Sequence, residues 1–282
     1  MKFVKLHGAG NDYLFIDGRR GERDWPALAR VMSDRHFGVG SDGIIVALPS
    51  DKAQARMLMF NADGSEGEMC GNGIRCFARF VTELGIASPS NGSLKIETGA
   101  GVLSVTPVFE NGKMARARVA MGQPRFKPDE IPVKLPASAK LQRVWDHPLE
   151  IDGRKLSISC VSMGNPHAVA FLKEPVDQFP LEALGPKVEH HPMFPRRVNF
   201  EIVNVLDTAH IKARVWERGS GITLACGTGA CAIAVASKLH GYTSNRVDVA
   251  LPGGALTVEW PGSGEVLLEG PIEEVFEGQW PD

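Results

Sequence analysis

Two cysteines stand in nearly the same local sequence, Cys70 in C-G-N-G and Cys226 in C-G-T-G, and each precedes an apolar segment. If each segment forms a helix, its first turn exposes backbone N–H groups and the positive end of the helix dipole. Such a place favours a thiolate over a thiol and can also bind a carboxylate. Each motif therefore predicts a reactive sulfur beside an anion site.

Inversion of a carbon stereocentre needs two groups of this kind. One base removes the α-proton from one face of the carbon, and a conjugate acid delivers a proton to the other face. Aimed N–H groups stabilise the carboxylate as it gains enolate character. We therefore expect Cys70 and Cys226 to be an acid–base pair on opposite faces of one ligand.

The other cysteines carry no such context. A lone cysteine is more often a small buried hydrophobe, and we interpret Cys76, Cys160 and Cys231 in this way. The spacings C-x5-C and C-x4-C are longer than the usual gap of structural zinc sites, so we expect no metal site. The odd total of 5 cysteines argues against a disulfide framework and fits a reducing compartment.

An internal repeat connects the two cysteine motifs. The motifs are 156 positions apart, and G-N-D at Gly10 lies 154 positions before G-N-P at Gly164. In the same order, G-A-G-V-L-S-V at Gly99 lies 153 positions before P-G-G-A-L-T-V at Pro252. Because three matches are collinear at nearly one offset, the sequence predicts a duplication.

The elements that must hold these motifs follow from the hydrophobic pattern. It predicts helices over 73–84 and 229–240, each followed by glycine, and a third over 25–34 with Asp24 as its N-cap. Alternating or β-rich runs predict strands at 3–6, 13–17, 43–48, 56–60, 94–98, 102–105, 115–121, 156–161, 168–172, 199–205, 210–216, 246–250, 256–260 and 265–268.

The predicted architecture is two similar halves of the α/β class, each a strand-rich unit around one long helix. The expected domains are residues 1–120, with the tail of about 266–282 crossing back to them, and residues 121–265. The proline-rich stretch from Lys127 to Arg154 is expected to be a linker or an irregular excursion.

Polar residues near the repeated glycines are candidate ligands. Four asparagines, which in such places are often merely turn formers, could bind ammonium and carboxylate groups: Asn11, Asn61, Asn165 and Asn199. Arg218, in a glycine-rich loop, suits a bidentate carboxylate contact. Glu217 could accept from an ammonium group or raise the basicity of a thiol, and His167 could exchange a proton with a thiol.

The composition excludes several classes of protein. A hydrophobic fraction of 43% and a charged fraction of 23% are those of a globular chain, and no apolar run is long enough to span a membrane. The net charge of −2 predicts no general attraction to nucleic acid or to anionic membrane. The N-terminus turns polar too early for a signal peptide, so we expect a cytoplasmic protein.

The motifs as a set resemble those of the diaminopimelate epimerase family. They are H-G-A-G-N-D-Y at 7–13, F-N-A-D-G-S-E-G-E-M-C-G-N-G-I-R-C at 60–76, M-G-N-P-H at 163–167 and W-E-R-G-S-G-I-T-L-A-C-G-T-G-A at 216–230. The resemblance implies interconversion of LL- and meso-diaminopimelate without pyridoxal phosphate or any other cofactor, in lysine and peptidoglycan precursor synthesis. It also implies two pseudo-symmetric domains, each a mixed, mostly antiparallel, barrel-like sheet around a central helix.

The resemblance also implies roles for individual residues. The paired cysteines of the family match Cys70 and Cys226, and its two assisting side chains match His167 and Glu217. The implied substrate contacts are Asn11, Asn61, Gly71, Asn72, Asn165, Asn199, Glu217, Arg218, Gly227 and Thr228. The family commonly dimerises through a C-terminal aromatic position that matches Phe276, where many members carry Tyr.

One departure and two alternatives remain open. Many members carry Gln where this chain has Gly43, so a side-chain contact to substrate is lost there. A proline racemase-like enzyme would also use paired cysteines, but a distal clamp of Asn61, Asn165, Asn199 and Arg218 would be superfluous for proline. A non-catalytic amino-acid binding protein would bind without proton exchange and would leave the duplicated cysteines unexplained.

Overall fold

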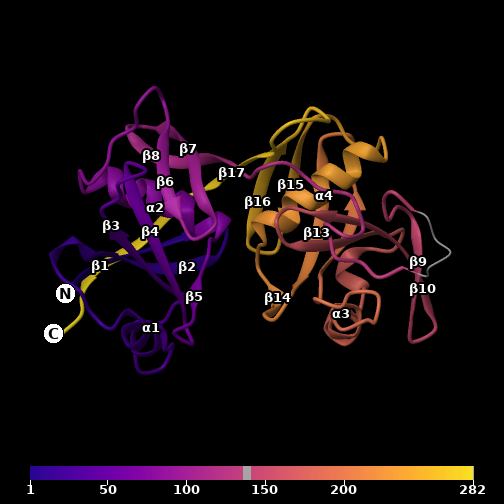
Figure 1. Ribbon diagram of the computed structural model, residues 1–282, viewed down its shortest axis with the longest axis horizontal. Coiled ribbons are helices and arrows are strands. Elements are labelled where there is room, and N and C mark those ends of the chain that lie inside the picture. Colours follow the sequence, from indigo (N-terminus) through magenta and orange to yellow (C-terminus); the bar gives the residue numbers. More distant parts are fainter. Residues whose placement is uncertain (136–140, 282) are drawn as a thin grey trace. The chain divides into compact units, whose positions relative to one another are not determined.

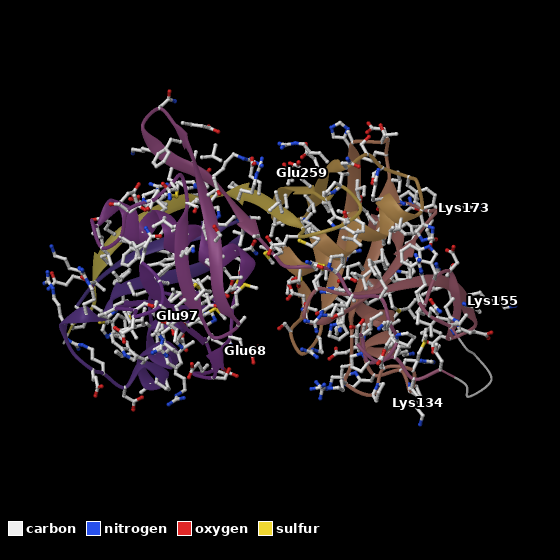
Figure 2. All side chains as sticks on the ribbon, turned by 45° about the horizontal axis from the view of Figure 1, so that its top comes forward. Glu68, Glu97, Lys134, Lys155, Lys173 and Glu259 are labelled. Atoms are coloured by element: carbon white, nitrogen blue, oxygen red, sulfur yellow. The ribbon has the colours of Figure 1, made fainter. Side chains whose placement is uncertain are left out.

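The two cysteine motifs belong to different units of the fold. A computed structural model describes residues 1–135 and 141–281. The chain divides into two compact units, residues 1–120 with 269–282 and residues 121–268 (Figure 1). Charged side chains such as Lys155 and Lys173 point outward from the second unit (Figure 2).

The first unit is built around helix α2 (Gly71–Glu83), in which every residue from Gly71 to Val81 is buried. Helix α1 (Trp25–Ser33) begins after Asp24, whose carboxylate accepts from Ala27 N at 3.0 Å as an N-cap. A short 3-10 turn, η1, covers Gly18–Arg20. The strands are β1 (Lys2–Gly8), β2 (Asn11–Asp17), β3 (Gly43–Leu48), β4 (Ala55–Asn61), β5 (Glu66–Gly67), β6 (Leu94–Thr98), β7 (Gly101–Glu110), β8 (Lys113–Ala120) and β18 (Glu273–Gln279).

The strands of the first unit form a mixed sheet. Strands β2 and β3 are parallel, as are β4 and β6. Antiparallel pairs are β1–β2, β3–β4, β4–β5, β6–β7 and β7–β8. The C-terminal strand β18 pairs antiparallel with β1, from Lys2 opposite Gln279 to His7 opposite Glu273, so the end of the chain completes the sheet of the first unit.

The second unit is built around helix α4 (Gly227–Leu239), which is buried along most of its length. The short turn η2 (Val176–Gln178) and helix α3 (Leu181–Glu189) hold the places in the element order that η1 and α1 hold in the first unit. The strands are β9 (His147–Ile151), β10 (Arg154–Ser162), β11 (Pro166–Phe171), β12 (Asn199–Val205), β13 (His210–Glu217), β14 (Gly221–Thr223), β15 (Arg246–Leu251) and β16 (Gly254–Glu259), and β17 (Leu267–Pro271) runs across the boundary between the units.

The pairings of the second unit repeat those of the first. Strands β11 and β12 are parallel, as are β13 and β15. Antiparallel pairs are β10–β11, β12–β13, β13–β14 and β15–β16. The order of parallel and antiparallel neighbours from β10 to β16 is that from β1 to β7. The predicted α/β fold class with a mixed sheet and a central helix is confirmed.

Of the two alternatives expected for the stretch from Lys127 to Arg154, the linker is wrong. The stretch contains β9 and supplies buried residues to the core of the second unit, namely Ile131, Val133, Val144, Leu149 and Ile151. Its described residues before β9 form no helix or strand, as expected of an irregular excursion. Its prolines interrupt the hydrophobic pattern but leave enough apolar side chains to pack. Residues 136–140, which include Pro136, lie outside the described residues.

Within residues 1–135 and 141–281, no helix is both long enough and apolar enough to cross a membrane.

Candidate active site

Each cysteine of the repeated motif is the N-cap of its central helix. Cys70 accepts from Gly73 N and Cys226 accepts from Gly229 N, both at 3.4 Å from nitrogen to Sγ. The two N-caps also share an extended backbone, with φ −130° and ψ 122° at Cys70 and φ −116° and ψ 115° at Cys226. Each sulfur thus occupies the place that a Ser or Asp oxygen takes in an ordinary N-cap, beside the N–H groups of Gly71 and Asn72 or of Gly227 and Thr228.

The repeat extends to the strand ends around each cysteine. In the first unit Tyr13 pairs with Gly43, and Gly43 pairs with Asn61. The starts of β2 and β3 therefore lie beside the end of β4. In the second unit His167 is joined to Asn199 in the same parallel register. Tyr13 therefore holds the sheet position in the first unit that His167 holds in the second.

Asn11 connects Cys70 to a carboxylate. The thiol of Cys70 donates to Asn11 Oδ1 at 3.1 Å. The amide nitrogen of Asn11 donates to Asp42 Oδ2, which also accepts from Asp12 N at 3.0 Å. Arg35 donates to the carboxylates of both Asp12 and Asp42, at 2.7 and 2.9 Å. The predicted contact residue Asn11 thus has its amide orientation set by Asp42.

Tyr13 is a buried neighbour of Cys70 that the sequence reasoning did not single out. Burial raises the pKa of Tyr13 well above its usual value, and the charge and hydrogen bond of Cys70 raise that pKa further. The hydroxyl therefore stays protonated near Cys70. Its place two residues after Asn11, on the same face of β2, was the signal that could have found it.

Asn72 is held by a buried arginine at the start of α2. Arg75 is fully buried and donates to Gly71 O and to Asn72 Oδ1, both at 2.9 Å. Asn72 itself is 2% exposed. Arg75 was also not singled out from the sequence, because an arginine in a helix is usually a surface residue.

Asn61 and Gly43 lie opposite each other at the end of β4. The Asn61 amide donates to Ser65 Oγ at 2.9 Å, so its side chain is fixed within the loop that leads to Cys70. A Cβ on Gly43 would lie 2.1 Å from Phe60 O. The backbone here admits no larger residue without a shift, so this position offers no side chain for a contact with substrate.

A chain of hydrogen bonds runs through the second unit to Cys226. Its Sγ lies 3.5 Å from Thr228 Oγ1, which accepts from Asn165 Nδ2 at 3.1 Å. Asn165 Oδ1 lies 3.0 Å from His167 Nε2, and His167 Nδ1 lies 2.6 Å from Glu201 Oε1. The structure thus brings three predicted residues together, Asn165, His167 and Thr228, and adds Glu201.

The environment of Cys226 favours the neutral thiol. Burial raises the pKa of Cys226 well above its usual value, and the carboxylates of Glu217 and Glu201 raise it further. The hydrogen bonds from Thr228 and Gly229 lower that pKa by less. The expectation that a helix start makes this cysteine a thiolate is therefore wrong for Cys226 in this structure, because desolvation and two nearby carboxylates outweigh the helix N–H groups.

The loop after β13 holds the remaining predicted residues. Buried Asn199 accepts from Arg218 N and donates to Pro166 O, both at 2.9 Å. Glu217 Oε1 accepts from Thr223 Oγ1. The guanidinium of Arg218 is exposed and contacts Arg196 O at 3.3 Å. Asn199 therefore anchors the Arg218 loop through its side chain.

The structure also places the three remaining cysteines and Phe276. Cys76, Cys160 and Cys231 are buried, as expected of packing residues, and burial raises the pKa of Cys76 to about 12. Phe276 lies on β18, 42% exposed, in edge contact with Phe3 at 6.0 Å between ring centroids. Among residues 1–135 and 141–281 there is no group of three or more His, Cys, Asp or Glu side chains that could hold a metal ion.

Solved structures with the same fold include two with low sequence identity. A probable proline racemase from Agrobacterium radiobacter K84 is 14% identical with a TM-score of 0.69, covering 99% of this chain and 92% of that one. A Bacillus anthracis phenazine biosynthesis protein of the PhzF family is 18% identical with a TM-score of 0.71, covering 99% and 98%. These likenesses concern the fold alone.

Closer similarity is found at the level of sequence. The family model of diaminopimelate epimerase matches residues 3–127 and 159–275. A diaminopimelate epimerase of Acetivibrio thermocellus is 47% identical over 281 residues, which cover 99% of this chain and 98% of that one. One of Pelotomaculum thermopropionicum is 48% identical over 284 residues, which cover 100% and 99%. The chain therefore belongs to the diaminopimelate epimerase family.

Proposed function

We propose that this protein interconverts LL- and meso-diaminopimelate by moving the α-proton between Cys70 and Cys226. The observation that carries the proposal is the matched N-cap geometry of the two sulfurs, each 3.4 Å from the N–H of the third helical residue. Membership of the family supports the choice of substrate. A place in lysine and peptidoglycan precursor synthesis, and in the cytoplasm, follows from that substrate.

In the proposed reaction one sulfur is a thiolate and the other a thiol at the start of each turnover. The thiolate removes the α-proton from one face, and the thiol delivers its proton to the opposite face of the carbanion. After one turnover the sulfur that removed the proton is a thiol and the sulfur that delivered it is a thiolate. The two sulfurs have exchanged roles, so the same pair can catalyse the reverse reaction. Because the thiols supply both proton transfers, the proposed reaction uses no pyridoxal phosphate.

The carboxylate at the reacting carbon is assigned to the two helix starts. The N–H groups of Gly71, Asn72, Gly227 and Thr228 lie in the first turns of α2 and α4, where the helix dipoles favour negative charge. These groups stabilise the enolate-like charge more strongly than the ground-state carboxylate. Asn11, through its contact with Cys70, belongs to the same reacting end.

The distal amino and carboxyl groups are assigned to Asn61, Asn165, Asn199 and Arg218. Arg218 supplies the positive charge for the distal carboxylate, and the asparagines supply donors and acceptors. His167 and Glu217 are assigned to proton transfer with the thiols. Glu217 already acts on the thiol of Cys226, whose pKa its charge helps to raise.

We further propose a homodimer formed through Phe276. This ring and Val275 are 42% and 50% exposed on β18, a strand whose residues are mostly open to solvent. An exposed edge with large apolar side chains is suited to pairing with a second copy.

The direct test is conversion of LL- to meso-diaminopimelate by the purified protein with no added cofactor, followed by chiral chromatography, with L-proline as the matched control substrate. We expect turnover of diaminopimelate, insensitivity to hydroxylamine, and no formation of D-proline. Turnover of proline in place of diaminopimelate would reject the proposal in favour of a proline racemase-like enzyme. Binding without any turnover would leave only an amino-acid binding protein.

A further inference from the structure

Glu201 is a buried carboxylate to which the proposed reaction assigns no role. The side chains of Glu201 and His167 are both 0% exposed, and their Oε1 and Nδ1 atoms lie 2.6 Å apart. Among the described residues, the second carboxylate oxygen, Oε2, has no hydrogen-bond partner. A buried carboxylate is costly to keep, so its presence needs a reason beyond packing.

The repeat shows that the fold does not require a carboxylate at this place. Glu201 and Ile45 are each the third residue of the equivalent strands β12 and β3, 156 positions apart. Each lies beneath the start of the central helix. A Cβ on Gly229 would be 3.1 Å from Glu201 Oε1, and a Cβ on Gly73 would be 2.7 Å from Ile45 Cδ1. The first unit thus fills this position with an apolar side chain.

The proton count of the His167–Glu201 pair follows from its hydrogen bonds. Asn165 Nδ2 donates to Thr228 Oγ1, so Asn165 Oδ1 faces His167 Nε2 and that nitrogen must carry a hydrogen. At 2.6 Å, His167 Nδ1 and Glu201 Oε1 cannot face each other with two lone pairs, so a second proton lies between them. The pair therefore holds two protons and has no net charge, which is the state that full burial favours.

We infer that Glu201 is a positioning residue. Its carboxylate keeps His167 protonated on Nε2. The hydrogen on Nε2 in turn fixes the Asn165 amide with its nitrogen toward Thr228, beside Cys226. The inference rests on the proposed function, in which Asn165 binds substrate and Cys226 transfers the proton. Without the carboxylate, neutral His167 can place its one proton on Nδ1. A bare Nε2 would then favour the flipped amide of Asn165, with its oxygen toward Thr228.

The electrostatics of the site agree with this role. Burial raises the pKa of Glu201, while the charge and hydrogen bond of His167 lower it by less. The titratable groups that act on Glu201, or on which it acts, are His167, Glu217, Cys160 and Cys226. In the first unit the equivalent pair is Tyr13 and Ile45, which has no carboxylate, so the two halves of the repeat surround their cysteines with different charge.

The test combines a spectroscopic and a kinetic measurement on the full chain. In protein with 15N-labelled histidine, the His167 signals are identified by their loss in a His167→Gln variant. We expect the wild-type Nε2 to carry a hydrogen, as its contact with Asn165 Oδ1 requires. In Glu201→Gln we expect changed ring 15N shifts, a fall in kcat/KM of about 10-fold to 100-fold and a displaced pH profile.

The control is Glu269→Gln, which removes another buried carboxylate, paired with Arg116 and Arg118. We expect this variant to keep the wild-type pH profile and the wild-type His167 signals. If Glu201→Gln does not fold, Glu201→Ile takes its place, because the first unit has an isoleucine, Ile45, at the equivalent position.

A wild-type Nε2 without hydrogen, or a Glu201 variant with unchanged His167 signals and an unchanged pH profile, would overturn the inference. If the wild-type protein does not epimerise diaminopimelate, the proposed function fails by itself. The 15N signals then still decide whether Glu201 sets the protonation of His167.

Discussion

The thiol of Cys70 donates a hydrogen bond to Asn11 Oδ1 at 3.1 Å, because Asp42 engages the other end of the same amide. With its nitrogen bound to the Asp42 carboxylate, the Asn11 amide presents its oxygen, its one acceptor, to the thiol. The orientation of Asn11 therefore depends on a residue 31 positions further along the chain, immediately before β3. In the second unit the Asn165 amide is likewise oriented by a partner, His167.

Replacing Asp42 tests this relationship. Asp42→Ala removes the carboxylate that binds the Asn11 amide nitrogen. We therefore expect kcat/KM for diaminopimelate to fall by about 10-fold to 100-fold and the free energy of unfolding by about 1–3 kcal/mol. The control is Asp17→Ala at the other end of β2 from Asn11, because Asp17 pairs with Arg19 in a surface contact. Equal kinetic losses in both variants would show that Asp42 does not act through Asn11.

The two repeated cysteines should be indispensable and the other cysteines dispensable. In Cys70→Ala or Cys226→Ala the thiol that removes or delivers the proton is lost, and we expect the epimerisation rate to fall by at least about 100-fold. Cys76→Ala is the matched control, since Cys76 is buried six residues after Cys70 and packs within α2. Near-normal turnover in either of the first two variants would remove that sulfur from the mechanism.

The pKa of Cys226 predicts how its reactivity depends on pH. Its pKa is raised, so the thiol form persists as the pH rises past the usual range of a cysteine, and the nucleophilic thiolate appears only at higher pH. Alkylation of Cys226 by iodoacetamide can be followed by mass spectrometry in the ligand-free protein. We expect its rate to keep rising with pH above about pH 9.

Glu217→Gln removes one of the charges that raise the pKa of Cys226. We therefore expect this variant to alkylate Cys226 faster than the wild type at pH values near neutral, although epimerisation falls. A slower alkylation, or a wild-type rate that is already constant at neutral pH, would contradict the assigned direction of the pKa shift.

The proposed dimer depends on an apolar ring at Phe276. Phe276→Lys places a charge on the exposed face of β18, and we expect sedimentation velocity to show a monomer where the wild type is a dimer. Phe109→Lys provides the control, because Phe109 is also on a strand of the first unit and is 53% exposed. A wild type that sediments as a monomer, or a Phe276→Lys variant that stays dimeric, would exclude an interface through this residue.

Much of the fold could be predicted from local sequence. Hydrophobic period and flanking glycines located α2 and α4 within two residues at each end, and the strands 43–48, 94–98 and 199–205 have the predicted bounds. The stretch containing β9 was misinterpreted because prolines signal turns but do not prevent burial. Helix α3 was missed because Pro186 lies inside it.

The site was predictable where its residues lie in repeated motifs. Both cysteines and the flanking glycines share one local sequence, and Asn11 and Asn165 share another. Glu201, Tyr13 and Arg75 were missed because local sequence does not show that a polar side chain is buried against a partner from another element. The repeat contained one further signal, since aligning Ile45 with Glu201 places a carboxylate where the other half has an aliphatic residue.

Proton transfer between two monoprotic thiols can be followed by epimerisation of LL-diaminopimelate in heavy water at low conversion. A thiol exchanges its hydrogen with solvent before it protonates the carbanion. We therefore expect meso product with deuterium at the inverted carbon, while the remaining LL substrate keeps its hydrogen. Product that retains the substrate hydrogen, or recovered LL substrate that acquires deuterium as fast as product forms, would contradict this expectation.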